Sequence, residues 1–240
     1  IKYIKDIRSE HAEAFLKDSI CRGCSNNTVL QYKARLDKLA LLAAKKYRTS
    51  VHYMEHVKIN LNENTKKVRD KAFSRADYDT IMTYTKDSKS YSRVGLELAG
   101  MTGARAEEIT NIRAKDINLD QKIIHIHNGK GKRSRDIPIQ NKDIRRLTEL
   151  ILALRPEEKL APVRANSLNQ YLARQCFRLG ITEYKEAKTG VHAIRKMYAT
   201  EAYLERINSG MGKEEAWGEV SEILGHGKDR MDLFRVYVKV

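Results

Sequence analysis

Apolar residues recur at helical spacing in the first part of the chain, around residues 14–20 and again along residues 29–42. Spacings of three and four residues place such side chains on one face of a helix. Between the two series the chain reads RGCSNNT, where Gly23 can end one helix and Ser25 can cap the next, which we expect to begin near Thr28. The pattern predicts at least two helices packed as a small bundle.

The stretch 60–70 is polar and charged, and it has no large apolar residue after Leu61. Such a composition is typical of a connection between packed units. We therefore expect a helical domain at residues 1–66, a linker at 67–73 and a second domain at 74–240.

The second domain is predicted to be mostly helical. Helical periodicity resumes after Ser74 and returns at residues 91–102, and Gly103 breaks it before a new helix near Ala106 that we expect to run through Ile112. Residues 116–139 alternate in the manner of strands around a glycine-rich turn, which predicts a hairpin. The expected fold class is mainly α with a small antiparallel β-sheet.

The charge of the chain indicates a polyanionic partner. Lys and Arg number 46 against 31 Asp and Glu, a net charge of +15, and both the first 70 residues and the remainder are basic. This balance suits nucleic acid or an anionic membrane surface. No apolar run approaches the ~18 residues of a membrane span, and no signal peptide heads the chain, so we expect a soluble intracellular protein with reduced cysteines. Because the chain begins with Ile rather than Met, we also expect it to be a piece of a longer protein.

Two arginines suggest a phosphate site. Arg105, in TGARAEEI, precedes a predicted helix. The N-terminus of a helix carries partial positive charge, so the dipole does not stabilise a cation there. An arginine at this position therefore suggests a bound anion that is attracted by both the arginine and the helix N-terminus. Arg195 lies three residues after His192 in HAIR, so both point from one helical face. Two guanidinium groups can grip the oxygens of one phosphate, and a neighbouring lysine or histidine can move protons on either side of it.

The order of these motifs, continued by NGKGK, LGH and RVY, resembles the tyrosine recombinase (phage integrase) family. The resemblance implies a catalytic set made of Arg105, Lys130, His192, Arg195, His226 and Tyr237. Tyr237 would supply the attacking oxygen, and Lys130, at the tip of the hairpin, would protonate the leaving oxygen. By position alone Lys132 and Arg133 could also reach that oxygen. We expect His226, after Gly225, to lie near the start of a helix.

Further residues take supporting roles by the same resemblance. Glu108 lies one helical turn beyond Arg105 and is expected to orient the site through a hydrogen bond. Lys196, where many relatives carry His, is expected to lie behind the catalytic residues. We expect Lys132, Arg133 and Arg135 to contact the DNA.

The resemblance also implies the activity and the partners. A helical, SAM-like core-binding domain and a catalytic domain would enclose double-stranded DNA, which is cleaved and rejoined through a 3′-phosphotyrosyl intermediate without cofactor or metal. A homotetramer would act on two DNA sites through a Holliday junction, with help from accessory DNA-bending proteins. We expect an integrase or transposase of a mobile element that works in the cytoplasm of a prokaryotic host and has no membrane partner.

Two other functions remain open at this stage. A type IB topoisomerase uses much the same residues, and a DNA-binding architectural protein without cleavage activity would share the basic charge. Three metal-like patterns have simpler explanations: CRGC as a pair of thiols, HYMEH as a chance string, and His125 with His127 as one face of a strand.

Overall fold

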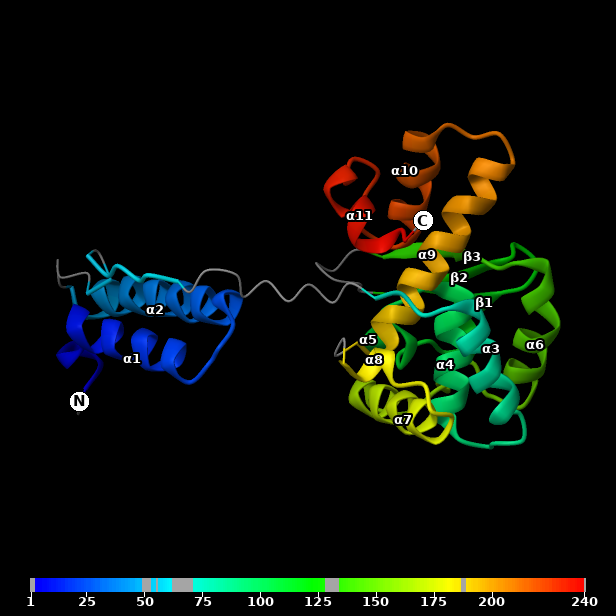
Figure 1. Cartoon of the computed structure of the whole chain (residues 1–240), viewed down its shortest axis with the longest axis horizontal. Helices are drawn as coiled ribbons and strands as arrows, with labels where there is room; N and C mark the ends of the chain where they lie inside the picture. The colour runs from blue at the N-terminus through cyan, green and yellow to red at the C-terminus, as the bar shows by residue number, and fades with distance from the viewer. Residues whose placement is uncertain are drawn as a thin grey trace. The chain divides into compact units, whose positions relative to one another are not determined.

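The computed structural model describes residues 3–48, 53–54, 56–61, 71–127, 134–186 and 189–239. The chain divides into two compact units, Ile1–Val68 and Arg69–Val240 (Figure 1). No helix in these described ranges is long and apolar enough to cross a membrane.

The first unit is a helical pair. It contains the 3-10 turn η1 (Ile4–Asp6) and the helices α1 (Ser9–Cys21) and α2 (Asn26–Tyr47), which pack against each other. Ser25 caps α2, because its hydroxyl oxygen accepts a 3.2 Å hydrogen bond from the backbone N–H of Thr28. The buried apolar side chains of this unit are Ala12, Leu16, Val29, Ala40, Tyr53, Met54 and Val57. The predicted bundle of at least two helices is confirmed.

The second unit combines helices with a three-stranded sheet. Its elements are, in chain order, α3 (Arg75–Tyr84), α4 (Tyr91–Thr102), α5 (Ala106–Ile109), η2 (Ala114–Asp116), β1 (Ile117–Asn118), β2 (Ile123–Ile126), β3 (Arg135–Pro138), α6 (Asn141–Leu152), α7 (Ala165–Arg178), α8 (Glu183–Glu186), α9 (Val191–Asn208), α10 (Lys213–Ile223), η3 (Met231–Leu233) and α11 (Phe234–Tyr237). The predicted fold class is confirmed.

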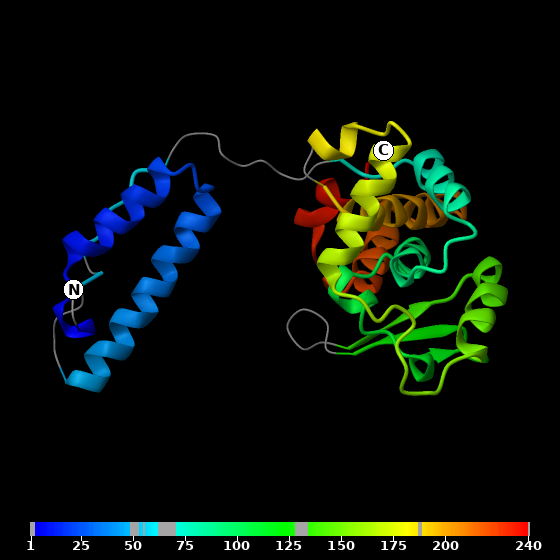
Figure 2. The ribbon, with the colours of Figure 1, turned by 90° about the horizontal axis from the view of Figure 1, so that it is seen from below.

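Helix α9 is the central element of this unit. It packs against α4, α7, α10 and α11. Figure 1 shows α7 and α8 toward its N-terminal end and α10 toward its C-terminal end. The sheet lies at one edge of the unit next to α6, as the second view shows (Figure 2).

The sheet is antiparallel in the order β1-β2-β3. Ile124 of β2 lies between Ile117 of β1 and Ile137 of β3, and Ile126 lies opposite Arg135. The isoleucines at 124, 126 and 137 are buried, because alternate residues of a strand point to one face. The predicted hairpin is therefore present, and its apolar face closes the core.

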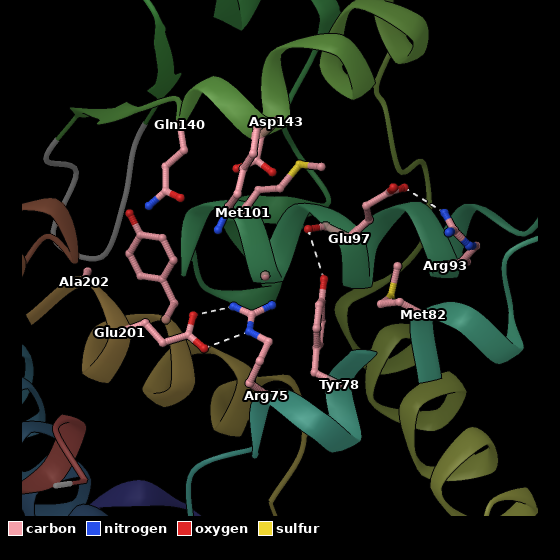
Figure 3. Close-up of a pocket in the computed structure, with 13 residues that line it drawn as sticks. Arg75, Tyr78, Met82, Arg93, Glu97, Met101, Gln140, Asp143, Glu201 and Ala202 are labelled. Atoms are coloured by element: carbon pink, nitrogen blue, oxygen red, sulfur yellow. Dashed lines mark hydrogen bonds and ion pairs between the residues drawn. The ribbon is translucent and has the colours of Figure 1, made fainter. Parts of the chain in front are cut away.

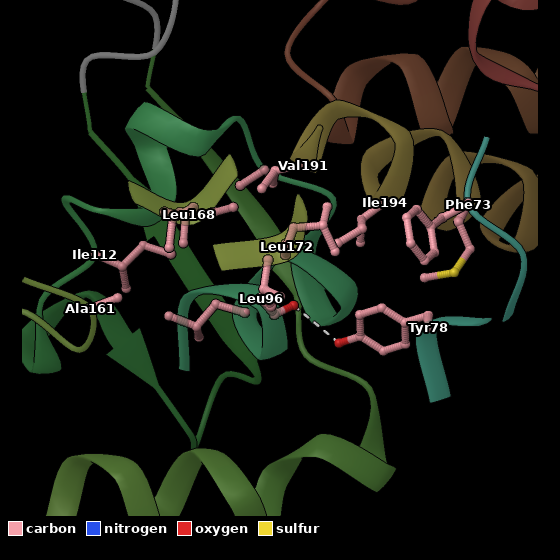
Figure 4. Packing of buried hydrophobic residues seen from close by; sticks show 14 of the residues in the cluster. Phe73, Tyr78, Leu96, Ile112, Ala161, Leu168, Leu172, Val191 and Ile194 are labelled. Carbon is pink, nitrogen blue, oxygen red and sulfur yellow. Dashed lines mark hydrogen bonds between the residues drawn. The ribbon is translucent and has the colours of Figure 1, made fainter. Parts of the chain in front are cut away.

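The main core joins side chains from helices that are distant in the sequence. Figure 4 shows its centre, where Leu96 of α4, Leu168 and Leu172 of α7 and Val191 and Ile194 of α9 converge. All five are at most 3% exposed. Packing of these three helices holds α9 and the turn after α4 in place.

Local capping explains where α3 begins and where α4 ends. Ser74 caps α3, because its hydroxyl accepts a 3.0 Å bond from the N–H of Asp77. Gly103 caps the end of α4, because its φ of +58° is left-handed, and a Cβ at this position would lie 2.4 Å from the ring of Tyr198. The helix predicted to run from Ala106 through Ile112 is shorter than expected, since α5 ends at Ile109 and Leu160 N–H bonds instead to the Ile112 carbonyl.

Leucine truncation tests this core. We expect Leu168→Ala, at a position with 0% exposure, to lower the free energy of unfolding by about 2–5 kcal/mol through lost transfer energy and a cavity. Leu152→Ala, at 78% exposure, is the matched control and should change it by less than about 0.5 kcal/mol. Denaturant titrations followed by fluorescence of Trp217, the only tryptophan, measure both. Equal effects of the two variants would contradict the assignment of the core.

Candidate functional site

Five of the six predicted catalytic residues are described, and they gather around α9. His192 and Arg195 come from α9, Arg105 precedes α5, His226 follows α10 and Tyr237 ends α11. The sixth, Lys130, lies outside the described residues, as do Lys132 and Arg133, which were predicted to contact DNA. Their roles stay predictions.

Arg195 is the centre of the cluster and is only 1% exposed. Its Nη1 donates to the Gly103 carbonyl at 2.7 Å, and its Nη2 donates to the Leu224 carbonyl at 2.6 Å and to Nε2 of His226 at 3.1 Å. Its Nε is buried and has no hydrogen-bond partner among the described residues. Burial, and next the charge of Arg105, lower the pKa of Arg195 to about 10. A buried guanidinium beside another cation, with a free N–H, is arranged to receive an anion.

Tyr237 lies against this arginine and is 6% exposed. The Cζ atom of Arg195 lies 5.4 Å from the centre of the tyrosine ring. The ring of His226 is 5.0 Å from the same centre, and that of His192 is 5.4 Å away. One phenol, two imidazoles and one guanidinium therefore share a single contact zone, although 45 residues separate His192 from Tyr237 in the chain.

His226 follows the end of a helix and not the start of one, which corrects the expectation from the sequence. Helix α10 ends at Ile223, and Gly225 has a left-handed φ of +75°. The N–H of His226 then bonds back to the Ser221 carbonyl at 2.9 Å. Glycine after the last turn of a helix takes this conformation without steric cost, so LGH is a helix-terminating turn.

The imidazole of His226 is held in its neutral form. Burial, followed by the charges of Arg195 and Arg105, lowers its pKa to about 3. Because a guanidinium can only donate, Nε2 of His226 accepts the bond from Arg195 and the ring proton lies on Nδ1. His226 can therefore donate one hydrogen bond at neutral pH without carrying charge.

Glu108 joins two arginines at the first turn of α5. Its Oε2 accepts from the backbone N–H of Arg105 at 2.9 Å, and its Oε1 accepts from Nη1 of Arg105 at 2.8 Å. Arg135 donates to the same two oxygens at 3.1 and 2.8 Å. Burial acts to raise the pKa of Glu108, but the bonds from Arg135 and Arg105 outweigh it and lower the pKa to about 2. Glu108 thus lies where it can orient Arg105.

The structure places two other predicted residues away from solvent. Arg135 was expected to contact DNA, but its guanidinium is engaged by Glu108 and by the Ile223 carbonyl, at 2.6 Å from Nε, and its side chain is 10% exposed. The sequence did contain a sign that Arg135 faces inward. It lies two residues before the buried Ile137, and alternate residues of a strand share a face. Lys196 follows Arg195 on α9 and is fully buried.

His125 in β2 and His127 just after it each pair with a carboxylate. His125 lies 2.5 Å from Asp136, and His127 lies 3.0 Å from Asp116. Within the described residues, no group of three or more His, Cys, Asp or Glu side chains could hold a metal ion.

A separate hollow of 220 Å³ lies between α3, α4, α9 and the start of α6 (Figure 3). Several charged side chains at this hollow are paired. Arg75 of α3 bonds to Glu201 of α9, and Glu97 of α4 accepts from Arg146 of α6 at 2.9 Å and from Arg93 of its own helix at 2.8 Å. Two of these pairs connect different helices, and we interpret the hollow as part of the packing between them.

The pairing of Glu108 predicts a pH-dependent contribution to stability. A carboxylate whose folded pKa is depressed stabilises the protein above its unfolded pKa, and this contribution is lost as the pH falls from about 4.5 to about 2. We expect Glu108→Gln to lower the free energy of unfolding at neutral pH by about 1–3 kcal/mol, because buried arginine donors lose their acceptor. The difference from wild type should shrink across that acid range.

Glu107→Gln is the matched control, because Glu107 is the adjacent residue of the same turn and is exposed. Unfolding titrations of the three proteins at several pH values measure the effect. A Glu108→Gln deficit that persists unchanged in acid would contradict the charge-based explanation.

Comparisons with known proteins give the same picture of the fold. A lambda integrase fragment in a dimer bound to a COC′ core site is 16% identical with a TM-score of 0.65, over 94% of this chain and 81% of that one. The Tn1549 transposon integrase in complex with transposon right end DNA is 16% identical with a TM-score of 0.66, over 99% and 83%. A lambda integrase seen as a tetramer bound to a Holliday junction is 18% identical to this chain with a TM-score of 0.64, and the match covers 96% of this chain and 65% of that one.

Likeness at this level of identity shows a shared fold, and no curated protein sequence matches the chain. The family itself is shown by a sequence model. The model of the phage integrase family matches residues 71–240, most of the chain and a range that contains every candidate site residue. The chain therefore belongs to the phage integrase family, the tyrosine recombinases.

Proposed function

We propose that this protein is a site-specific DNA recombinase that cleaves and rejoins double-stranded DNA through a 3′-phosphotyrosyl intermediate. The observation that carries the proposal is the contact zone of Tyr237 with Arg195, His192 and His226, in which the buried Nε of Arg195 has no hydrogen-bond partner in the described part of the chain. A phosphodiester has the charge and the oxygens that such a group needs. No small apolar substrate would satisfy it.

The cleavage step assigns one role to each group. Arg195 and Arg105 bind the non-bridging oxygens of the scissile phosphate, where negative charge grows as the phosphorane forms. The Tyr237 oxygen forms a bond to phosphorus and gives its proton to the imidazole of His192, because the acceptor nitrogen of His226 is bonded to Arg195. The bond from phosphorus to the 5′ oxygen breaks, and Lys130 supplies the proton of the leaving 5′-hydroxyl.

His226 acts in this scheme as a neutral donor. With its proton on Nδ1 and a pKa near 3, it stabilises a phosphate oxygen by a hydrogen bond and does not add another charge beside Arg195. Glu108 keeps Arg105 in place through its side-chain and backbone bonds. Geometry fixed before the substrate binds lowers the cost of reaching the transition state.

Rejoining follows from the same chemistry in reverse. The phosphotyrosyl ester keeps the energy of the broken bond, so the 5′-hydroxyl of another strand can attack phosphorus and release Tyr237. Two such exchanges on paired sites give recombination without a nucleotide cofactor. We propose that a homotetramer on two DNA sites carries this out for a mobile element, with accessory DNA-bending proteins; support comes from the shared fold with a lambda integrase that was seen as a tetramer on a Holliday junction.

The test is formation of a covalent adduct. Bound sequences are first selected from random duplexes, and the selected duplex is then made with a nick beside the cleavage position, so that the released 5′ fragment diffuses away. We expect a protease-sensitive DNA adduct, formed also in EDTA, that is lost by at least about 10³-fold in Tyr237→Phe because the nucleophile is absent. Addition of a strand with a free 5′-hydroxyl should convert the adduct to joined DNA.

Tyr91→Phe, at an exposed tyrosine of α4, is the control and should form the adduct like wild type. An adduct that survives Tyr237→Phe would show that another residue attacks. Selected duplexes that bind without ever forming an adduct would support a DNA-binding protein without cleavage, and relaxation of supercoils without strand transfer would support a topoisomerase.

A further inference from the structure

We propose that Arg135 is a positioning residue of the cleavage site, which ties the Arg105–Glu108 pair to the turn that carries His226. The inference rests on the proposed function, because it concerns the rate of the cleavage step. It replaces the contact with DNA that the sequence suggested for this arginine.

One side of the Arg135 guanidinium fixes Glu108. Nη1 and Nη2 donate to the two carboxylate oxygens at 3.1 and 2.8 Å, a forked pairing that sets both the position and the plane of the carboxylate. The same two oxygens hold the side chain and the backbone N–H of Arg105. The orientation of Arg105 is therefore set by the Glu108 carboxylate, and Arg135 fixes the position of that carboxylate.

The other side of the guanidinium fixes the end of α10. Nε donates to the carbonyl of Ile223, the last residue of that helix, at 2.6 Å. Terminal carbonyls of a helix lack partners within it and attract cations. The Cβ that Gly225 lacks would lie 3.1 Å from Nη1 of Arg135, so the backbone of the turn packs directly on the guanidinium. The next residue in the chain is His226.

Two arginines thus hold this turn through consecutive carbonyls. Arg135 binds the carbonyl of Ile223, and Arg195 binds the carbonyl of Leu224 and the ring of His226. Without Arg135 the turn would keep its own backbone bonds, the bond from the Ser221 hydroxyl and the bonds to Arg195, which we assign to the phosphate. A residue that bonds to the turn but not to the substrate keeps the turn in place independently of the phosphate.

Arg135 also sets the charge balance at the site. A lone Glu108 beside Arg105 would neutralise that arginine and weaken its attraction for a phosphate. Because Arg135 shares the carboxylate, the trio keeps a net positive charge while Glu108 stays fixed. The side chains of Arg135 and Glu108 are 10% and 6% exposed, so water screens these charges little.

The test separates positioning from DNA contact. In Arg135→Lys the charge remains, but one ammonium cannot reproduce the fork and the bond to Ile223. We expect the single-turnover rate of adduct formation, measured on pre-bound nicked duplex, to fall by about 10-fold to 100-fold. The dissociation constant for the duplex and its salt dependence should match wild type.

Two further variants sharpen this comparison. Arg145→Gln, at an α6 arginine whose side chain is 91% exposed, should leave both rate and affinity unchanged. In a double-mutant cycle, Arg135→Gln combined with Glu108→Gln should slow cleavage no more than the slower single variant, because the two residues act as one unit. Trp217 fluorescence confirms that each variant is folded before its rate is compared.

The outcomes separate this inference from the proposed function. Loss of affinity with a salt slope reduced by about one, at an unchanged cleavage rate, would make Arg135 a phosphate contact and overturn the positioning role. A normal rate in Arg135→Lys, or additive effects in the cycle, would overturn it too. No adduct in wild type would instead remove the proposed function on which the inference rests.

Discussion

The buried guanidinium of Arg195 is the constraint on which the site depends. A charged group with 1% exposure has lost its hydration, and the protein must replace that hydration with fixed dipoles. The carbonyls of Gly103 and Leu224 do so from two different segments. Arg195 therefore joins the turn after α4 to the turn after α10, and it cannot be satisfied unless both turns are correctly formed.

The rest of the second unit supplies the rigidity for this arrangement. Gly103 has a left-handed conformation and lies so close to the Tyr198 ring that a side chain would not fit there, which places its carbonyl against Arg195. Packing of α4 and α7 against α9 holds the segment from which Arg195 and His192 project. The apolar core and the polar site therefore depend on each other, because α9 contributes side chains to both.

Sequence patterns predicted the elements better than the connections between them. Serine before an apolar series marked the starts of α2 and α3, because its hydroxyl satisfies a free N–H whatever the tertiary fold. His226 of LGH was predicted to lie near the start of a helix, but it follows the end of one. A glycine indicates that a helix is interrupted, but whether a helix ends before it or begins after it depends on the packing of neighbouring elements. The forked pairing of Arg135 with Glu108 joins residues 27 positions apart. In the sequence Arg135 follows a basic segment, and only its alternation with Ile137 along the strand indicated that its side chain is buried.

The residues that the sequence assigned by motif and those that geometry adds differ in physical role. In the proposed function, Arg105, Arg195 and the imidazoles offer groups to a ligand, so their type would be set by chemistry that recurs wherever a phosphate is cleaved. Arg135 serves these groups through carbonyls and a carboxylate, and such a partner is set by the local path of the backbone. Burial is the largest cause of the lowered pKa of Arg195, and the charge of Arg105 is the next, so this guanidinium is held near another cation at a cost in free energy. An anion bound between Arg195 and Arg105, as we propose, would offset the repulsion between these cations, so part of the cost of holding them together would be recovered when the phosphate binds.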